Sequence, residues 1–248
     1  TYNGEIYNFQ EIRKELEAHG YGFRSRTDTE VILAAYAELG KECFTRFNGM
    51  FAFALWDKKE QVLWLVRDRL GVKPLFYINQ PDMVAFASEI KGLLPALSRS
   101  PRVNGEALYH FLSLNYTPAP FTLFEGIVQL LPGHYLMCPR NGPAQLSRYW
   151  DIVPSRVNDA NTEEYLKELL SDSVRLRLIS DVEVGAFLSG GVDSSAVVAL
   201  MLQHRRSSIK TFTATFHEAS YNEASGARAI ANALGTQHEE QIFKCSVL

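Results

Sequence analysis

The chain has 248 residues, of which 46% are hydrophobic and 21% charged, as is typical of a soluble globular protein with one large domain or two ordinary ones. A formal net charge of −3 and the lack of an apolar run of ~18 residues give no reason to expect nucleic acid or a membrane as a partner. Three cysteines (Cys43, Cys138 and Cys245) are scattered without metal-ligand spacing, which suits a reducing compartment and predicts a cytoplasmic protein.

The first two-thirds of the chain read mostly as β-strands with a few helices. Residues 11–20 and 28–39 have the apolar spacing of amphipathic helices, and Asn104 is placed to cap a helix that ends at Leu114. Strands are expected in three hairpins, each joined by a polar turn: 51–57 with 61–68, 74–78 with 83–88, and 133–138 with 144–150.

The pattern changes after the polar, turn-rich segment 153–161, which predicts a linker between two domains, 1–152 and 162–248. Helices are then expected at 162–179, 194–204 and 222–234, and strands at 182–188, 210–216 and 237–243. This alternation predicts the start of a parallel sheet, whose ligands bind at the carboxyl ends of the strands.

The stretch VEVGAFLSGGVDSS at 182–195 joins an apolar strand to a helix start near Ser194 through a loop of small residues. Gly190 and Gly191 let the backbone approach a ligand closely, and the helix N-terminus offers free N–H groups, a combination that suits a pyrophosphate. No Gly-Lys-Ser/Thr follows, so this is not a Walker A loop. The alternative is an ordinary Gly-Ser turn; the preceding strand, Asp193 and the later serines favour the pyrophosphate site over it.

A family resemblance follows from five motifs taken together. SGGVDSS resembles the PP-loop of ATP pyrophosphatases, which cleave ATP between its α and β phosphates. Four more motifs precede it: TYNGEIYN (1–8), RTDTEVILAAY (26–36), FNGMFAFALWD (47–57) and RDRLGVKPLFY (67–77). In this order, over nearly the whole chain, they resemble the glutamine-hydrolysing asparagine synthetases.

The resemblance implies a fold of mixed α/β and α+β class. An N-terminal-nucleophile hydrolase-type layered β domain, the class II (type 2) glutamine amidotransferase, would precede the start of a parallel-sheet PP-loop domain. The first domain would split glutamine to glutamate and ammonia. The second would activate aspartate with ATP and Mg²⁺ as β-aspartyl-AMP, from which ammonia displaces AMP. The resemblance is also compatible with a homodimer.

In the first domain the resemblance assigns the oxyanion hole to Asn3 and Gly4, which would donate a side-chain and a backbone N–H. Asn3, Gly4 and Glu5 would bind glutamine, and Asp28 would pair with its α-amino group. Asp28 also stands where a helix N-cap is expected, and both roles are open to it. For Arg67 and Asp68 a structural ion pair at a strand end is favoured over catalysis.

In the second domain the resemblance assigns ATP binding to the residues of one loop and to one residue of the next strand. The residues are Leu188, Ser189, Gly190, Gly191, Val192, Asp193, Ser194, Ser195 and Ala214. Asp193, the carboxylate inside the loop, is the expected Mg²⁺ contact. Thr213 to Thr215 are expected to face the same crevice and to contact adenine.

The family's nucleophile, a cysteine at the mature N-terminus, has no counterpart here, and its arginine-containing segment and second ATP motif are missing too. We therefore expect a fragment truncated at both ends and inactive by itself. Thr1 as the nucleophile is disfavoured, because a strand residue cannot fold back on Asn3 two positions away. Two other interpretations stay open: an amidotransferase of the same architecture with another acceptor, as in surface-polymer or β-lactam chemistry, or a non-catalytic protein.

Overall fold

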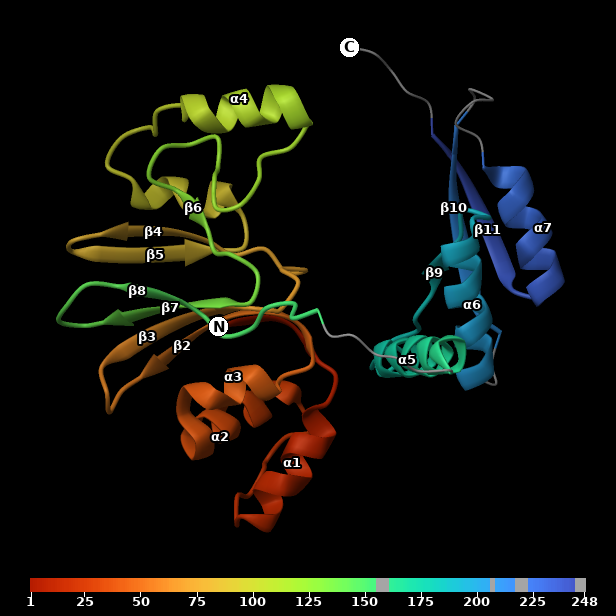
Figure 1. The fold of residues 1–248 in the computed structure, drawn as a ribbon, viewed down its shortest axis with the longest axis horizontal. Coiled ribbons are helices and arrows are strands. Elements are labelled where there is room, and N and C mark those ends of the chain that lie inside the picture. The colour runs from red at the N-terminus through yellow and green to blue at the C-terminus, as the bar shows by residue number, and fades with distance from the viewer. Residues whose placement is uncertain (155–160, 206–207, 217–222, 244–248) are drawn as a thin grey trace. The chain divides into compact units, whose positions relative to one another are not determined.

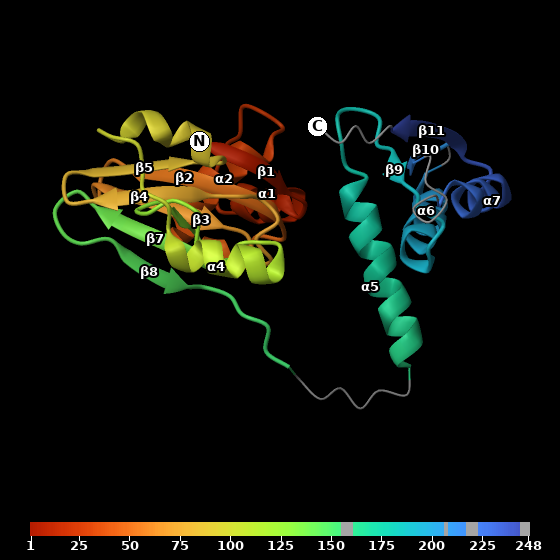
Figure 2. The same ribbon diagram turned by 90° about the horizontal axis from the view of Figure 1, so that it is seen from above.

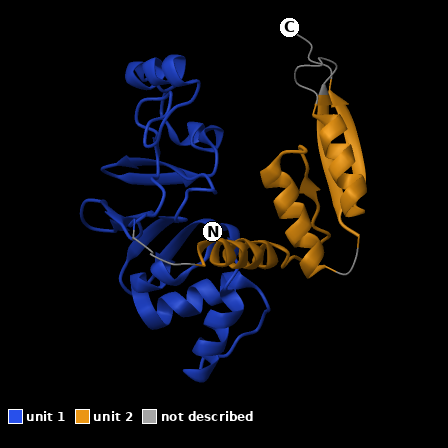
Figure 3. Ribbon diagram, turned by 45° about the vertical axis from the view of Figure 1, so that its right-hand side comes forward, with its two compact units in different colours: residues 1–155 blue, residues 156–248 orange. Residues whose placement is uncertain are grey.

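The computed structural model describes residues 1–154, 161–205, 208–216 and 223–243. Two units, residues 1–155 and 156–248, make up the chain, and each is described by itself (Figure 3). Residues 155–160 of the predicted linker and Cys245 lie outside the described residues. In the part that the structure describes, no helix has the length and apolar character needed to cross a membrane.

The first unit is built on two antiparallel sheets. The larger has the order β1-β2-β3-β7-β8, with bounds Tyr2–Ile6, Gly49–Asp57, Val62–Arg67, His134–Pro139 and Gln145–Arg148. The smaller has the order β5-β4-β6, with bounds Met83–Ala87, Phe76–Gln80 and Val128–Gln129.

Helices cover the outer faces of the two sheets, so that this unit is layered (Figures 1 and 2). The helices α1 (Phe9–Ala18), α2 (Asp28–Leu39) and α3 (Cys43–Arg46) lie against the larger sheet, and α4 (Gly105–Leu114) lies beyond the smaller one. Asn104 caps α4 as predicted, accepting hydrogen bonds from the N–H groups of Glu106 and Ala107 at 3.1 Å.

Strand alternation in β2 divides the core of this unit in two. Phe51 and Phe53 pack with residues of α1, α2 and α3. Ala52, between them, points the other way and packs with Leu65 and Tyr77 between the two sheets. Because successive side chains of a strand face opposite sides, one apolar strand supplies both layers.

The second unit is a parallel sheet with helices. Its order is β11-β10-β9, with bounds Gln237–Phe243, Lys210–Phe216 and Ala186–Phe187, and its helices are α5 (Thr162–Arg177), α6 (Val192–His204) and α7 (Ala224–Leu234). The predicted fold class, a layered β domain followed by the start of a parallel sheet, is therefore confirmed.

Most element boundaries lie within two residues of the predicted ones, and two of the differences bear on the loop after β9. The strand expected at 182–188 is reduced to β9, because only Ala186 and Phe187 find partners on β10. Helix α6 begins at Val192 rather than near Ser194, with Gly191 in an extended conformation as its N-cap.

Candidate functional site

The open edge of β1 is the first candidate site. Thr1 exchanges two hydrogen bonds with Ala54 of β2 (3.0 and 2.9 Å), and the Tyr7 N–H donates to the Asn48 carbonyl at 2.8 Å. Because alternate residues bond to the partner strand in an antiparallel pair, the N–H groups of Gly4 and Ile6 point away from β2. They face the side on which the residues that the structure describes add no further strand to the sheet.

Asp28 lies at this same edge. Its Oδ2 accepts hydrogen bonds from the Ile6 N–H at 3.0 Å and from the Tyr2 hydroxyl at 2.5 Å. The predicted N-cap role is wrong, because Thr27 is the N-cap of α2 and the Asp28 side chain reaches to β1 instead. Alternate strand residues are about 7 Å apart, so the Gly4 N–H and the Asp28 carboxylate lie roughly that far apart. This spacing suits an extended amino-acid amide with its two ends engaged.

Asn3 points to the other face of β1, towards the smaller sheet. Its Nδ2 donates to Ser88 Oγ at 3.3 Å, and both residues line a hollow of about 80 Å³ together with Thr1 and apolar side chains of β2 and β5. Ser88 was missed in the sequence, because 85 positions separate it from Asn3 and no local pattern joins them. Glu5 is exposed on the same strand.

The described cysteines are poor nucleophiles. Cys43 is fully buried, and burial raises the pKa of its thiol to about 12. Burial also raises the pKa of the Cys138 thiol to about 11. Since the thiolate is the reactive form, neither side chain is primed for attack near neutral pH.

Arg67 and Asp68 are structural, as predicted, but they do not form the predicted ion pair. The Arg67 guanidinium donates to the carbonyls of Gly71, Lys73 and Leu130. The Asp68 carboxylate is 1% exposed and accepts four backbone N–H groups, from Phe51, Leu70, Val72 and Lys73. Neighbouring residues at a strand end point to opposite faces, and therefore each serves a different stretch of backbone.

The second candidate site is the loop 188–195, at the carboxyl end of β9. Gly191 has no side chain with which to cap α6, so the first N–H groups of the helix have no side-chain acceptor there. The serine hydroxyls bond within the loop: Ser189 Oγ contacts Ser194 Oγ at 2.9 Å, and Ser195 Oγ donates to the Gly191 carbonyl at 2.7 Å. The Ser189 and Gly191 N–H groups are used within the loop as well, donating to Ser194 Oγ at 3.2 Å and to Ser189 Oγ at 3.3 Å. The donors left to face a ligand are the first N–H groups of α6.

Gly190 places this loop against a second helix. Its φ is +81°, a left-handed conformation that favours glycine. A Cβ on Gly190 would come within 2.6 Å of the Ala227 nitrogen and 2.7 Å of the Gly226 carbonyl carbon. The loop therefore lies directly on the first turn of α7 as well as at the start of α6.

The neighbouring strand β10 corrects one expectation. Thr213 and Thr215 are 5% and 3% exposed, and their hydroxyls donate to the Leu188 and Gln241 carbonyls. Their side chains are therefore buried and engaged within the unit, and the expectation that they face the crevice is not met. Ala214, between them, is exposed on the opposite face of the sheet.

Asp193 lies in the first turn of α6 with its side chain exposed. Among the described residues, no three His, Cys, Asp or Glu side chains gather into a group that could hold a metal ion. Asp193 thus offers one carboxylate at the start of the helix, where a negative charge is favoured by the helix dipole.

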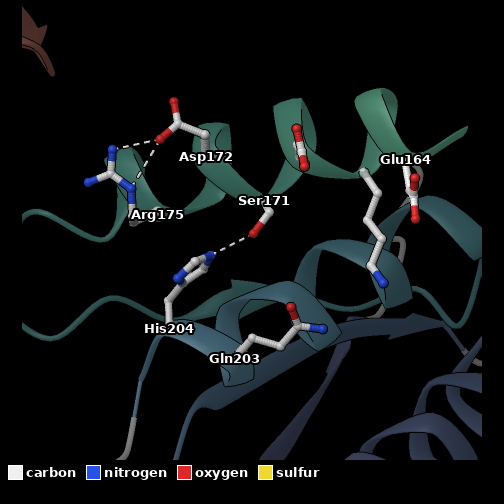
Figure 4. Close-up of a pocket in the computed structure, with 8 residues that line it drawn as sticks. Glu164, Ser171, Asp172, Arg175, Gln203 and His204 are labelled. Carbon is white, nitrogen blue, oxygen red and sulfur yellow. Dashed lines mark hydrogen bonds and ion pairs between the residues drawn. The ribbon is translucent and has the colours of Figure 1, made fainter. Parts of the chain in front are cut away.

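A separate hollow of about 430 Å³ lies between the polar face of α5 and the end of α6 (Figure 4). Two pairs of its side chains contact one another: Ser171 Oγ contacts His204 Nε2 at 2.8 Å, and Arg175 donates to Asp172. Asp193 is about 16 Å from His204 along the axis of α6, so this hollow does not belong to the loop 188–195.

Both parts of the chain match known families. Residues 1–150 match the family described as glutamine amidotransferase domain, and the chain belongs to that family. Residues 165–246 match the family described as asparagine synthase. The resemblance seen in the five motifs is confirmed.

Particular relatives carry both parts. The chain is 37% identical over 244 residues to asparagine synthetase [glutamine-hydrolyzing] 1 of Bacillus subtilis, covering 98% of this chain and 38% of that protein. It is 41% identical over 206 residues to asparagine synthetase [glutamine-hydrolyzing] 3 of the same organism, covering 82% and 33%. It is also 33% identical over 253 residues to amidase chry2 of Gibberella zeae, covering 94% and 37%. The chain thus spans between a third and two-fifths of these relatives' length.

Proposed function

We propose that the full-length protein containing this chain makes asparagine from aspartate, with ATP and with ammonia taken from glutamine. Residues 1–152 act as the amidotransferase domain, 153–161 as the linker, and 162–248 as the ATP-binding part. The observation that carries the proposal is the presence of two sites in one chain. One is an edge on which the Asp28 carboxylate and the outward-facing Gly4 N–H lie roughly 7 Å apart, and the other is a glycine loop at a helix N-terminus without a side-chain cap.

In the first unit, the residues of β1 bind and polarise glutamine. The Asp28 carboxylate pairs with the α-ammonium group, which selects an amino acid over a plain amide. The Gly4 N–H and the Asn3 amide donate to the oxygen on which negative charge develops, and one such donor contributes about 10²–10³ in rate. Glu5, on the same strand, also binds glutamine. Neither Cys43 nor Cys138 has the environment of the nucleophile.

In the second unit, the residues present fit the phosphates of ATP. The loop from Leu188 to Ser195 has a left-handed glycine, two positions without Cβ and the N–H groups of the first turn of α6. Such an arrangement binds anions through backbone donors. Asp193 holds Mg²⁺ together with phosphate oxygens. ATP supplies the adenylyl group that activates aspartate as β-aspartyl-AMP, and the exposed Ala214 contacts the nucleotide.

A second candidate keeps both sites and changes the acceptor. The similarity to amidase chry2 of Gibberella zeae favours it, because that match covers 94% of this chain in a protein that is not named an asparagine synthetase. Replacing aspartate by other carboxylates in the assay below distinguishes the two.

The test of the ATP site measures pyrophosphate release by the full-length protein with aspartate, ATP and Mg²⁺. Gly191→Val puts a branched side chain where phosphate must lie and abolishes release. Asp193→Asn keeps the shape, removes the charge that holds Mg²⁺, and also loses release while glutamine hydrolysis continues. If both variants release pyrophosphate at the parental rate, the loop is only a turn and the synthetase function is refuted.

The test of the glutamine site uses Asn3→Ala. We expect glutamine-dependent kcat to fall about 10²–10³-fold. Synthesis with ammonia continues, because ammonia bypasses the first unit. An equal loss with both nitrogen donors would show that Asn3 is only structural.

A further inference from the structure

The Tyr2 hydroxyl makes the shortest contact at the edge of β1. It donates to Asp28 Oδ2 at 2.5 Å, and the Ile6 N–H donates to the same oxygen at 3.0 Å. Among the described residues, no hydrogen bond to Asp28 Oδ1 is found. Two donors on one carboxylate oxygen fix the plane of the carboxylate and direct the other oxygen outward.

Burial and the neighbouring carboxylates keep the Tyr2 hydroxyl a hydrogen-bond donor. Its pKa is raised far above the ordinary value, first by burial, then by the hydrogen bond to Asp28, with further contributions from the Asp28 and Glu5 charges. Tyr2 therefore stays protonated over the whole working pH range and cannot change from donor to acceptor. A hydrogen bond to an ionised acceptor is stronger than one between neutral groups.

We propose that Tyr2 is a positioning residue for amino-acid recognition: with the Ile6 N–H it holds one oxygen of Asp28, so that the other oxygen meets the α-ammonium group of the substrate. This inference rests on the proposed function, since it assumes that Asp28 pairs with the α-amino group of glutamine. Tyr2 itself does not touch the substrate. Its effect is specific to substrates that carry an α-amino group.

The test compares two substrates in the full-length protein. Glutamine carries the α-amino group, whereas glutaramate has the same carboxamide and lacks it. Tyr2→Phe removes the hydroxyl and keeps the ring. We expect the KM for glutamine to rise about tenfold with kcat changed less than twofold, since one charge-assisted hydrogen bond is lost. With glutaramate kcat/KM stays within twofold of the parental value, and so does ammonia-dependent synthesis.

A matched control exists in the same core. The Tyr36 hydroxyl donates to Asp57 Oδ2 at 3.0 Å and accepts from the Trp64 indole at 2.8 Å. Tyr36→Phe removes a hydrogen bond of the same kind and leaves the Trp64 N–H unpaired, so it disturbs folding at least as much. It lies away from the edge of β1 and should leave both KM values unchanged.

The outcomes separate this inference from the proposed function. An unchanged glutamine KM in Tyr2→Phe, an equal loss with glutaramate, or the same rise in Tyr36→Phe overturns the role of Tyr2. If Asp28→Asn also leaves the glutamine KM unchanged, Asp28 is not the amino-group contact and that part of the proposed function fails as well. If Asp28→Asn raises the KM and Tyr2→Phe does not, only the role of Tyr2 is lost.

Discussion

Gly190→Ala should destabilise the second unit selectively. The added Cβ would lie 2.6 Å from the Ala227 nitrogen and 2.7 Å from the Gly226 carbonyl carbon, both of them backbone atoms that cannot rotate away. The left-handed backbone at φ +81° adds a cost of its own. About 1–2 kcal/mol for the conformation and about 1–3 kcal/mol for overpacking give a loss of roughly 2–5 kcal/mol in the free energy of unfolding.

Urea unfolding can assign this loss to one unit. The three tryptophans, Trp56, Trp64 and Trp150, all belong to residues 1–155, so their fluorescence follows the first unit alone, while circular dichroism follows both units. We expect the circular-dichroism transition of the second unit to move to lower urea and the fluorescence transition to stay in place.

The control is Gly191→Ser at the next position. Gly191 has an ordinary φ of −74°, and a Cβ there would meet only Ser189 Oγ at 3.4 Å. Serine is also a favoured N-cap, so the unfolding free energy should change by less than about 0.5 kcal/mol. If Gly190→Ala shifts the transition no further than Gly191→Ser, the steric reasoning about the loop is wrong.

Three more predictions concern the first unit. Asp68→Asn replaces an acceptor oxygen that faces backbone N–H groups, and should lower the free energy of unfolding by about 2–4 kcal/mol. Urea unfolding followed by tryptophan fluorescence measures this loss, and a loss no greater than that of Asp82→Asn, at an exposed turn residue, would contradict the prediction. Hydrogen bonds from Arg24 and Ser25 lower the pKa of Glu30 from 4.5 to about 2. Its stabilising contribution is therefore complete above about pH 4.5 and is lost as the pH falls towards 2. In Glu30→Gln the urea midpoint of unfolding should depend less on pH over that range than in the parental protein. In a Cys245→Ser variant, Cys43 and Cys138 should react with a thiol reagent at pH 8 only after unfolding; rapid labelling of the native protein would refute their burial.

Local patterns predicted the elements well where the chain signals its own boundaries. Helix α2 and strands β10 and β11 have the predicted limits, and Asn104 caps α4. β9 is shorter than its apolar run, because strand length depends on which residues of β10 find partners. An apolar pattern indicates where a strand can form, and pairing with the neighbouring strand determines how many of its residues form one.

The geometry of the first site could not be predicted from local sequence. Asp28 looks like a helix cap because it precedes a helical pattern, but its partners Tyr2 and Ile6 are 26 and 22 positions away. The expected ion pair between Arg67 and Asp68 failed for a reason that the sequence does contain, namely the alternation of side chains at a strand end. The motif itself identified the loop 188–195, since its glycines and serines are contiguous.

The turn that follows β3 is an unusually poor place to graft a tag or an extra peptide. Exposed turns usually accept insertions, and Leu70 and Val72 are 67% and 57% exposed. Yet the N–H groups of Leu70, Val72 and Lys73 all donate to the buried carboxylate of Asp68. The carbonyls of Gly71 and Lys73 both accept hydrogen bonds from the Arg67 guanidinium. A single added residue would shift these groups out of reach together. Surface access and tolerance to change in length are thus decoupled here, and a labelling strategy should use the turn at Asp82 instead.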